Sequence, residues 1–196
     1  MERGPDLRQS VLRAYSAAAL RPNDAHAFPV GRTFAESLGY PPEVLASLPA
    51  ACTDAFAGVS NLSLSAEIPP GRVILDLGCG AGLDSLIMAR RTGPHGTVIG
   101  VDFSFPMLAR ARHSARTAGI PNVAFCLAAA ENLPLRSGSI AVAIANGIFN
   151  LNPNRTTIFR ELARVLQEDG VVYSSELVLR GPLPLGHAGS EADWFA

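Results

Sequence analysis

Three glycines at alternate positions follow a short apolar stretch, and together they could hold a ligand. Residues 73–77 read Val-Ile-Leu-Asp-Leu, which predicts a buried strand, and Gly78, Gly80 and Gly82 follow before a helical pattern begins at Leu83. A strand that turns through glycines into a helix brings backbone N–H groups and the positive end of a helix dipole close to a ligand. The alternative is a glycine-rich turn that binds nothing.

A second acid stands where a ribose would need it. Asp102 follows the apolar run 97–101 and lies 20 residues after Gly82. A carboxylate at the tip of the second strand of a βαβ unit can accept hydrogen bonds from both ribose hydroxyls. The alternative is a favourable charge at the start of the next helix, but Ser104 and Pro106 already supply the cap and first-turn residue of that helix. We therefore interpret Asp102 as a ribose acceptor.

The spacing of the glycines and the acid among them indicate the charge of the ligand. The dinucleotide fingerprint Gly-x-Gly-x-x-Gly would require glycine at position 83, where this chain has Leu83. The carboxylate of Asp76 would repel a pyrophosphate but attract an ammonium group. S-adenosylmethionine carries a ribose, an adenine and an α-amino group, and it has no phosphate. A nicotinamide oxidoreductase remains the alternative reading of the same loop.

Residues 73–82 followed by residues 100–102 resemble motifs one and two of the class I S-adenosylmethionine-dependent methyltransferases. The resemblance extends over residues 72–179. It implies that S-adenosylmethionine is the cofactor and S-adenosylhomocysteine the product. It also implies a set of cofactor-binding positions, which are Asp76, Gly78, Cys79, Gly80, Gly82, Asp102, Phe103, Met107, Ala130, Glu131 and Asn146.

Several of these positions have a family role attached to them. Phe103 and Met107 stand where the family sandwiches the adenine, although core packing is an equal alternative for Met107. The family often has an acid for the adenine amino group at a position that is Ala129 here. Recognition would then fall to backbone groups around Ala130 and Glu131. Asn146 matches the residue after the fourth strand that lines the reaction centre.

A closer resemblance is to the arsenite methyltransferase-like branch of this family. It rests on Gly58-Val59-Ser60-Asn61 and on residues 145–153. Arsenite methyltransferases carry a cysteine in each segment, at positions that are Val59 and Gly147 here. Trivalent arsenic needs soft thiolate ligands. We therefore expect methyl transfer to a different small molecule, with arsenite methylation and non-catalytic cofactor binding as the alternatives.

The sequence assigns no catalytic residue and no metal site. A general base is needed only if the acceptor loses a proton in the transition state. Tyr15, His26 and Glu176 are the candidates, and each also has a purely structural reading. Acceptor contacts are expected from a helical segment that covers the cofactor, and the predicted positions are Tyr15, Ser60, Asn61 and Asn150.

Alternating strand and helix patterns predict an α/β fold with a doubly wound, mostly parallel sheet. The expected strands are 72–77, 97–101, 123–127, 140–146 and 171–179, and the expected core helices are 83–91, 105–117 and 155–166. Proline-broken helical segments at 6–20, 32–38, 42–48 and 50–57 predict an N-terminal cap over residues 1–66, followed by a cofactor-binding core over residues 67–196. After residue 179 only 17 residues remain, so the C-terminal end of the sheet is expected to be incomplete, with Trp194 and Phe195 beginning a further apolar element.

Composition bounds the remaining classes of function. Hydrophobic residues make up 48% of the 196 residues and charged residues 17%, with a net charge of −1, which favours a packed core and no nucleic-acid partner. No apolar run approaches the roughly 18 residues of a membrane span. Three widely spaced cysteines, Cys52, Cys79 and Cys126, favour a reducing cytoplasm over disulfides. A homodimer and a bacterial origin are further expectations.

Overall fold

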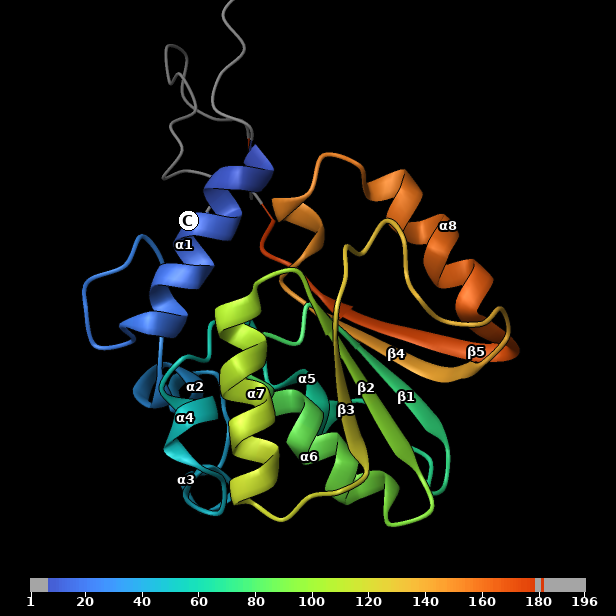
Figure 1. The fold of residues 1–196 in the computed structure, drawn as a ribbon, viewed down its shortest axis with the longest axis horizontal. Helices are drawn as coiled ribbons and strands as arrows, with labels where there is room; N and C mark the ends of the chain where they lie inside the picture. Colours follow the sequence, from blue (N-terminus) through green and yellow to red (C-terminus); the bar gives the residue numbers. More distant parts are fainter. Residues whose placement is uncertain (1–6, 179–180, 182–196) are drawn as a thin grey trace, which may run out of the picture.

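The computed structural model describes residues 7–178 and residue 181. Its centre is a five-stranded sheet in the order β3-β2-β1-β4-β5, in which every neighbouring pair is parallel (Figure 1). The strands are β1 (Val73–Leu77), β2 (Thr97–Asp102), β3 (Val123–Leu127), β4 (Ile140–Asn146) and β5 (Leu166–Ser175). The expected α/β fold with a doubly wound parallel sheet is confirmed. Strand order reverses between β1 and β4, and such a switch point opens a crevice at the carboxyl ends of the strands.

Helices cover both faces of the sheet, as apolar parallel strands require. Helices α6 (Leu83–Thr92) and α7 (Phe105–Thr117) lie on one face, and α8 (Arg155–Val165) lies on the other (Figure 1). Side chains of β1 alternate between these layers. Ile74 packs in a cluster with residues of α6, whereas Leu75 and Leu77 pack in a cluster with residues of α8.

Short helices form a cap that continues the α6–α7 layer (Figure 1). They are α1 (Leu7–Leu20), α2 (Arg32–Ser37), α3 (Pro42–Ala46), α4 (Ala50–Thr53) and α5 (Leu62–Ser65), and a 3₁₀ turn, η1 (Phe149–Leu151), follows β4. Cap residues such as Ala18 and Phe56 share one hydrophobic cluster with Leu86 of α6 and Met107 of α7. The cap is therefore built onto the sheet's own helices.

Arginines on the core helices bind backbone carbonyls of the cap. Arg110 of α7 donates to the carbonyl oxygens of Ala19 and Ala51, the second at 3.1 Å. Arg90 of α6 donates to the hydroxyl of Ser47 at 2.7 Å and to its carbonyl at 3.0 Å. These guanidinium groups satisfy carbonyls at the ends of short helices, which have no partner within the helix.

The fifth strand differs from its predicted position. It was expected over 171–179, but β5 begins at Leu166, which pairs with Ile140, and the register then shifts so that Val171 pairs with Val142. The chain re-enters the sheet directly after α8 because the amide groups of residues 138 and 139 bind the last carbonyls of that helix. Residues 179 and 194–195 lie outside the described part of the chain.

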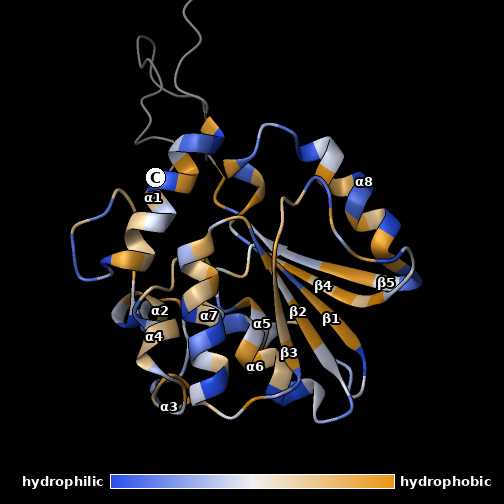
Figure 2. Ribbon diagram, viewed as in Figure 1, coloured by the Kyte–Doolittle hydropathy of each residue, from blue (hydrophilic) through white to orange (hydrophobic). Residues whose placement is uncertain are grey.

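Hydrophobic residues concentrate in the strands and in the helix sides that face them (Figure 2).

In residues 7–178 and 181, no helix combines the length and apolarity that crossing a membrane would require. At the sheet edge, β5 exposes Val171 and Val172 to 45% and 36%.

Replacing Arg110 with alanine is expected to lower the free energy of unfolding by about 1.5–3 kcal/mol, because two cap carbonyls lose a charged donor. Urea denaturation measures the change. The exposed Arg116, also on α7, gives the matched control Arg116→Ala. Equal destabilisation by the two variants would contradict the docking role of Arg110.

Candidate functional site

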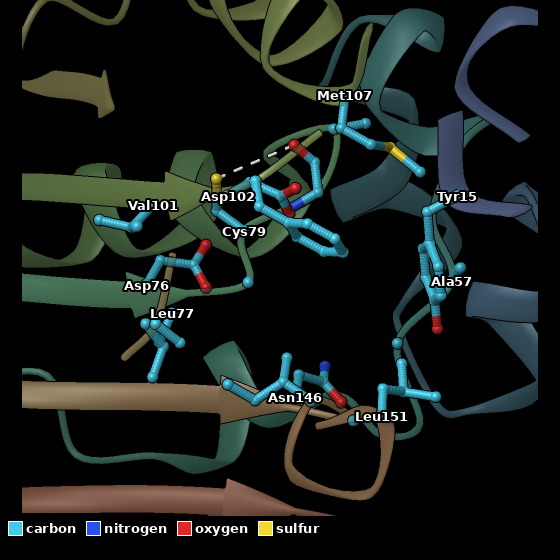
Figure 3. A pocket seen from close by; sticks show the side chains of 18 of the residues that line it. Tyr15, Ala57, Asp76, Leu77, Cys79, Val101, Asp102, Met107, Asn146 and Leu151 are labelled. Atoms are coloured by element: carbon cyan, nitrogen blue, oxygen red, sulfur yellow. Dashed lines mark hydrogen bonds between the residues drawn. The ribbon is translucent and has the colours of Figure 1, made fainter. Parts of the chain in front are cut away.

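A cavity opens at the carboxyl ends of β1, β2 and β4, where the strand order reverses. In Figure 3, Asp76 and Asp102 from the sheet face Tyr15 and Ala57 from the cap, while Met107 and Asn146 border the space between them. The lining also includes backbone from the glycine loop and from the segment after β3. Its residues include Gly78, Cys79, Gly80, Phe103, Ala128, Ala129, Ala130, Glu131, Gly147, Ile148 and Leu151.

The glycine loop requires glycine at Gly78 for two reasons. Its φ of +72° lies in the left-handed region, and an added Cβ would overlap Cγ2 of Ile148. The loop is fastened to β2, because the amide groups of Gly78 and Cys79 donate to the carbonyl of Val101 at 2.8 and 3.0 Å. Gly78 and Gly80 have no side chains, so at these two positions the backbone itself forms the cavity wall.

Asp102 connects this loop to the tip of β2. Its Oδ2 accepts a hydrogen bond from the Gly80 amide at 2.9 Å, and its Oδ1 accepts one from the Ser104 amide at 2.8 Å. The side chain is 7% exposed and lines the cavity, so each oxygen keeps a lone pair for a ligand hydroxyl. Burial raises the pKa of Asp102, and the amide donors counteract part of that rise.

Asp76 is a second buried acid on the cavity wall. It is 2% exposed, and it accepts a short hydrogen bond from the Ser85 hydroxyl. Burial raises its pKa from 3.8 to about 8, and the nearby carboxyls of Asp84 and Asp102 add to the rise. A cationic ligand group in the cavity would favour the ionised form.

Asp84 is a third acid at the cavity, and the sequence analysis did not identify it. It lies in the first turn of α6 and is 6% exposed. Tyr40 approaches its Oδ1 at 2.5 Å, and Asn146 donates to its Oδ2 at 2.9 Å. The signal that could have revealed it is an acid two residues after Gly82, within a turn whose other side chains are buried.

The structure brings most of the predicted positions to the cavity. Among the predicted cofactor positions Gly82 is the exception: it is the N-cap of α6, where an added Cβ would press on Ala111 and Phe125. The predicted positions that line the cavity are Asp76, Gly78, Cys79, Gly80, Asp102, Phe103, Met107, Ala130, Glu131, Asn146 and Tyr15.

The other three predicted acceptor residues do not line the cavity. The backbone of Ser60 is held by Asn146, and the Asn61 amide side chain donates to the Gly39 carbonyl at 3.2 Å. Asn150 donates to the carbonyl of Leu177. Each is engaged in holding loops together, which a sequence pattern does not distinguish from ligand contact.

The candidate bases also have structural partners. The Glu176 carboxylate accepts the amides of Ile148 and Phe149, both at 2.9 Å, and of Asn150 at 3.2 Å, so it holds the turn after β4. His26 pairs with a nearby backbone carbonyl at 2.9 Å and does not line the cavity. Tyr15 does line it, and burial raises its pKa, so its phenol stays neutral.

The cavity's cysteines are thiols. Burial raises the pKa of Cys52 to about 11 and raises that of Cys79 well above its ordinary value. All three cysteines are free. Within the described residues, no group of three or more His, Cys, Asp or Glu side chains could hold a metal ion.

These features fit S-adenosylmethionine. The cradle at Gly78 and Gly80 admits a ligand close to the backbone, Asp102 retains acceptors for hydroxyls, and Asp76 offers a buried carboxyl to a cation. Phe103 and Met107 line the cavity after β2, beside the ribose acceptor. A dinucleotide's pyrophosphate would instead meet the carboxyl groups of Asp76 and Asp84.

The raised pKa of Asp76 predicts a contribution to the pH dependence of stability that Asp76→Asn removes. The folded state binds a proton more tightly than the unfolded state, so the wild-type free energy of unfolding decreases as pH rises from about 4 to about 8. The asparagine variant should therefore gain stability relative to wild type over this window, as measured by urea denaturation at several pH values. Asp24→Asn, at an exposed site, is the control. Parallel profiles for wild type and Asp76→Asn would contradict the assignment.

Comparisons with known proteins agree with this geometry. The family model described as "Methyltransferase domain" matches residues 68–194. An arsenite methyltransferase of Halobacterium salinarum is 38% identical over 149 residues, which are 76% of this chain and 38% of that protein. A demethylmenaquinone methyltransferase of Lactococcus lactis is 37% identical over 107 residues, covering 54% of this chain and 42% of the relative.

A solved structure shows the same arrangement. The arsenic(III) S-adenosylmethionine methyltransferase of Chlamydomonas reinhardtii superposes with a TM-score of 0.64 and 30% identity, covering 70% of this chain and 50% of that one. The chain spans less than half the length of the two curated relatives named above. With the parallel sheet, the glycine loop and the acid after β2, these matches show that the chain belongs to the class I S-adenosylmethionine-dependent methyltransferases.

Proposed function

We propose that this protein transfers the methyl group of S-adenosylmethionine to a small-molecule acceptor other than arsenite. The observation that carries the proposal is the meeting of Asp102, the glycine loop and the buried carboxyl of Asp76 in one cavity at the switch point. This set of groups matches a ligand with a ribose and a positively charged end. The similarity to the arsenic(III) S-adenosylmethionine methyltransferase supports the choice of cofactor, but it does not indicate that arsenic is the acceptor here.

The chain's residues would act mainly by binding and orienting. Asp102 would accept the ribose hydroxyls, and Asp76 would face the ammonium group. The bound sulfonium supplies a methyl group that is already activated for transfer. The remaining task is to hold the acceptor in line with that methyl, which can provide a large part of a rate enhancement. Tyr15 would contribute a neutral phenol that donates a hydrogen bond.

Val59 and Gly147 disfavour arsenite as the acceptor. The resemblance to arsenite methyltransferases implies that these positions correspond to cysteines of that branch. The structure brings the two positions into contact: a Cβ at Gly147 would lie 3.0 Å from Cγ1 of Val59 and 3.8 Å from its Cβ. Val59 and Gly147 present only methyl groups and backbone atoms to an acceptor. Trivalent arsenic would find no thiolate there, and the thiols of Cys52 and Cys79 are protonated.

Calorimetric titration with S-adenosylhomocysteine and with NAD tests the cofactor. We expect binding of the first ligand only. Asp102→Ala should weaken it about tenfold or more, because two hydroxyls lose a charged acceptor and the Gly80 amide loses its partner. Asp169→Ala, at an exposed position on β5, is the control. Binding of NAD in place of S-adenosylhomocysteine would refute the proposal.

Cysteines introduced at positions 59 and 147 test which acceptor the protein can bind. In Val59→Cys/Gly147→Cys the two Cβ atoms would lie near the 3.8 Å typical of paired cysteines, so both sulfurs could bind one arsenic atom. Under reducing conditions, we expect arsenite binding by the double variant and none by wild type or by either single variant. The left-handed φ of +77° at position 147 should destabilise Gly147→Cys by about 1–2 kcal/mol, which urea denaturation measures. Methylation of arsenite by the wild-type protein would contradict this acceptor assignment.

Some of the earlier expectations stay predictions. One is a cytoplasmic location, which the three free cysteines favour. The others include a bacterial origin, a homodimer, and the division into a cap over 1–66 and a core over 67–196.

A further inference from the structure

Asp84 is the centre of a buried hydrogen-bond network that joins the cap to the end of β4. Its partners are Tyr40, which follows α2 and is 1% exposed, and Asn146, which ends β4. Both partners also contact the backbone of Ser60, in the loop between α4 and α5. The network therefore spans three separate segments at one edge of the cavity.

The orientation of the Asn146 amide follows from the loop it binds. Its Oδ1 accepts the backbone amides of Val59 and Ser60 at 2.9 and 3.1 Å, which only an oxygen can do. Its Nδ2 must then donate its two hydrogens, to the Ser60 carbonyl at 2.8 Å and to Oδ2 of Asp84 at 2.9 Å. Oδ2 of Asp84 is consequently an acceptor.

The Tyr40 hydroxyl has one hydrogen but two oxygen neighbours. It lies 2.5 Å from Oδ1 of Asp84 and 3.1 Å from the Ser60 carbonyl oxygen. If Asp84 were ionised, one of these contacts would bring two lone pairs together. If Oδ1 is protonated, it donates to the Tyr40 oxygen, and the Tyr40 hydroxyl donates to Ser60. Every contact then contains one hydrogen.

The surroundings favour the same state. The titratable groups that face Asp84 are Tyr40 from the cap and the carboxyl of Asp76 from β1, and Ser63 of α5 adds its hydroxyl and its backbone amide. Within residues 7–178 and 181, none of the ion pairs involves Asp84. Burial raises the pKa of Asp84, and its hydrogen bonds lower it by less.

We propose that Asp84 is a positioning residue that is protonated on Oδ1, and that it holds residues 58–60 across the cavity through Tyr40 and Asn146. The reason for holding this loop rests on the proposed function. Gly58 and Asn146 line the cavity, and Val59 packs on Gly147 beside it. A neutral Asp84 adds no charge to the cavity wall. Asp76 then supplies the charge that faces the cationic end of the cofactor.

The test uses the full chain with Asp84→Asn, Asp84→Leu and Tyr40→Phe. Infrared spectroscopy at pH 7 should show the carbonyl band of a protonated carboxylic acid in wild type, and a component of this band should be missing from Asp84→Asn. Asp76→Asn is the control, since it should remove a different component. An unchanged band in Asp84→Asn would show that Asp84 is ionised and would overturn the proposal.

Hydrogen exchange measures the positioning role without a ligand. Asparagine can donate to Tyr40 and accept from Asn146, so Asp84→Asn should keep the wild-type protection of the Val59 and Ser60 amides. Asp84→Leu and Tyr40→Phe should exchange there about tenfold faster, because the chain to Ser60 is broken. Equal loss of protection in Asp84→Asn and Asp84→Leu would overturn the proposal.

Cofactor binding separates this inference from the proposed function. S-adenosylhomocysteine affinity should stay within about threefold of wild type in Asp84→Asn and fall about tenfold in Asp84→Leu. Failure of wild type to bind would refute the proposed function, while the infrared band and the exchange rates would still decide the state and role of Asp84. A large affinity loss in Asp84→Asn with the band removed would show that the carboxyl group itself contributes to cofactor binding, and would overturn the assignment of Asp84 as a positioning residue.

Discussion

The parallel pairing of β1 between β2 and β4 is the constraint on which the site depends. Asp76 pairs in register with Gly100 on one side and with Ile144 on the other, so the ends of all three strands reach the same edge. The strand order reverses there, and the helices diverge to opposite faces of the sheet. The glycine loop, Asp102 and Asn146 are brought to one cavity by this pairing.

Burial of carboxyl groups at that edge governs its electrostatics. Asp76, Asp84 and Asp102 are all nearly inaccessible, and each has its pKa raised by loss of water. Their hydrogen bonds differ, and so do the consequences. Asp102 accepts the backbone amides of Gly80 and Ser104, which favour its ionised form, whereas Asp84 also contacts a phenol whose single hydrogen has two oxygen neighbours. The carboxyl groups of Asp76 and Asp102 on the cavity wall suit a cationic cofactor and disfavour phosphate.

The cap decides what lies opposite the cofactor. Its helices are short and broken by prolines, and they depend on arginines and a shared hydrophobic cluster for their position. The loop between α4 and α5 reaches the end of β4, where Val59 meets Gly147. At this contact the chain places the methyl groups of Val59 against the backbone of Gly147.

Local pattern was enough to predict the first four strands, the glycine loop and the acid after β2, because apolar runs, glycine and helix caps act over a few residues. Contacts between distant segments were not predictable in this way. Asn61 and Asn150 bind loop carbonyls, and Glu176 accepts amides of the turn after β4. Strand β5 starts early, where residues 138 and 139 bind the end of α8. Asp84 joins partners that are 44 and 62 residues away in the chain. The sequence by itself determined the cofactor half of this protein, since one continuous strand-turn-helix segment and the next strand form it. Only the tertiary structure decided which side chains lie opposite that segment across the cavity, because they meet through long-range packing and hydrogen bonds that have no local periodicity.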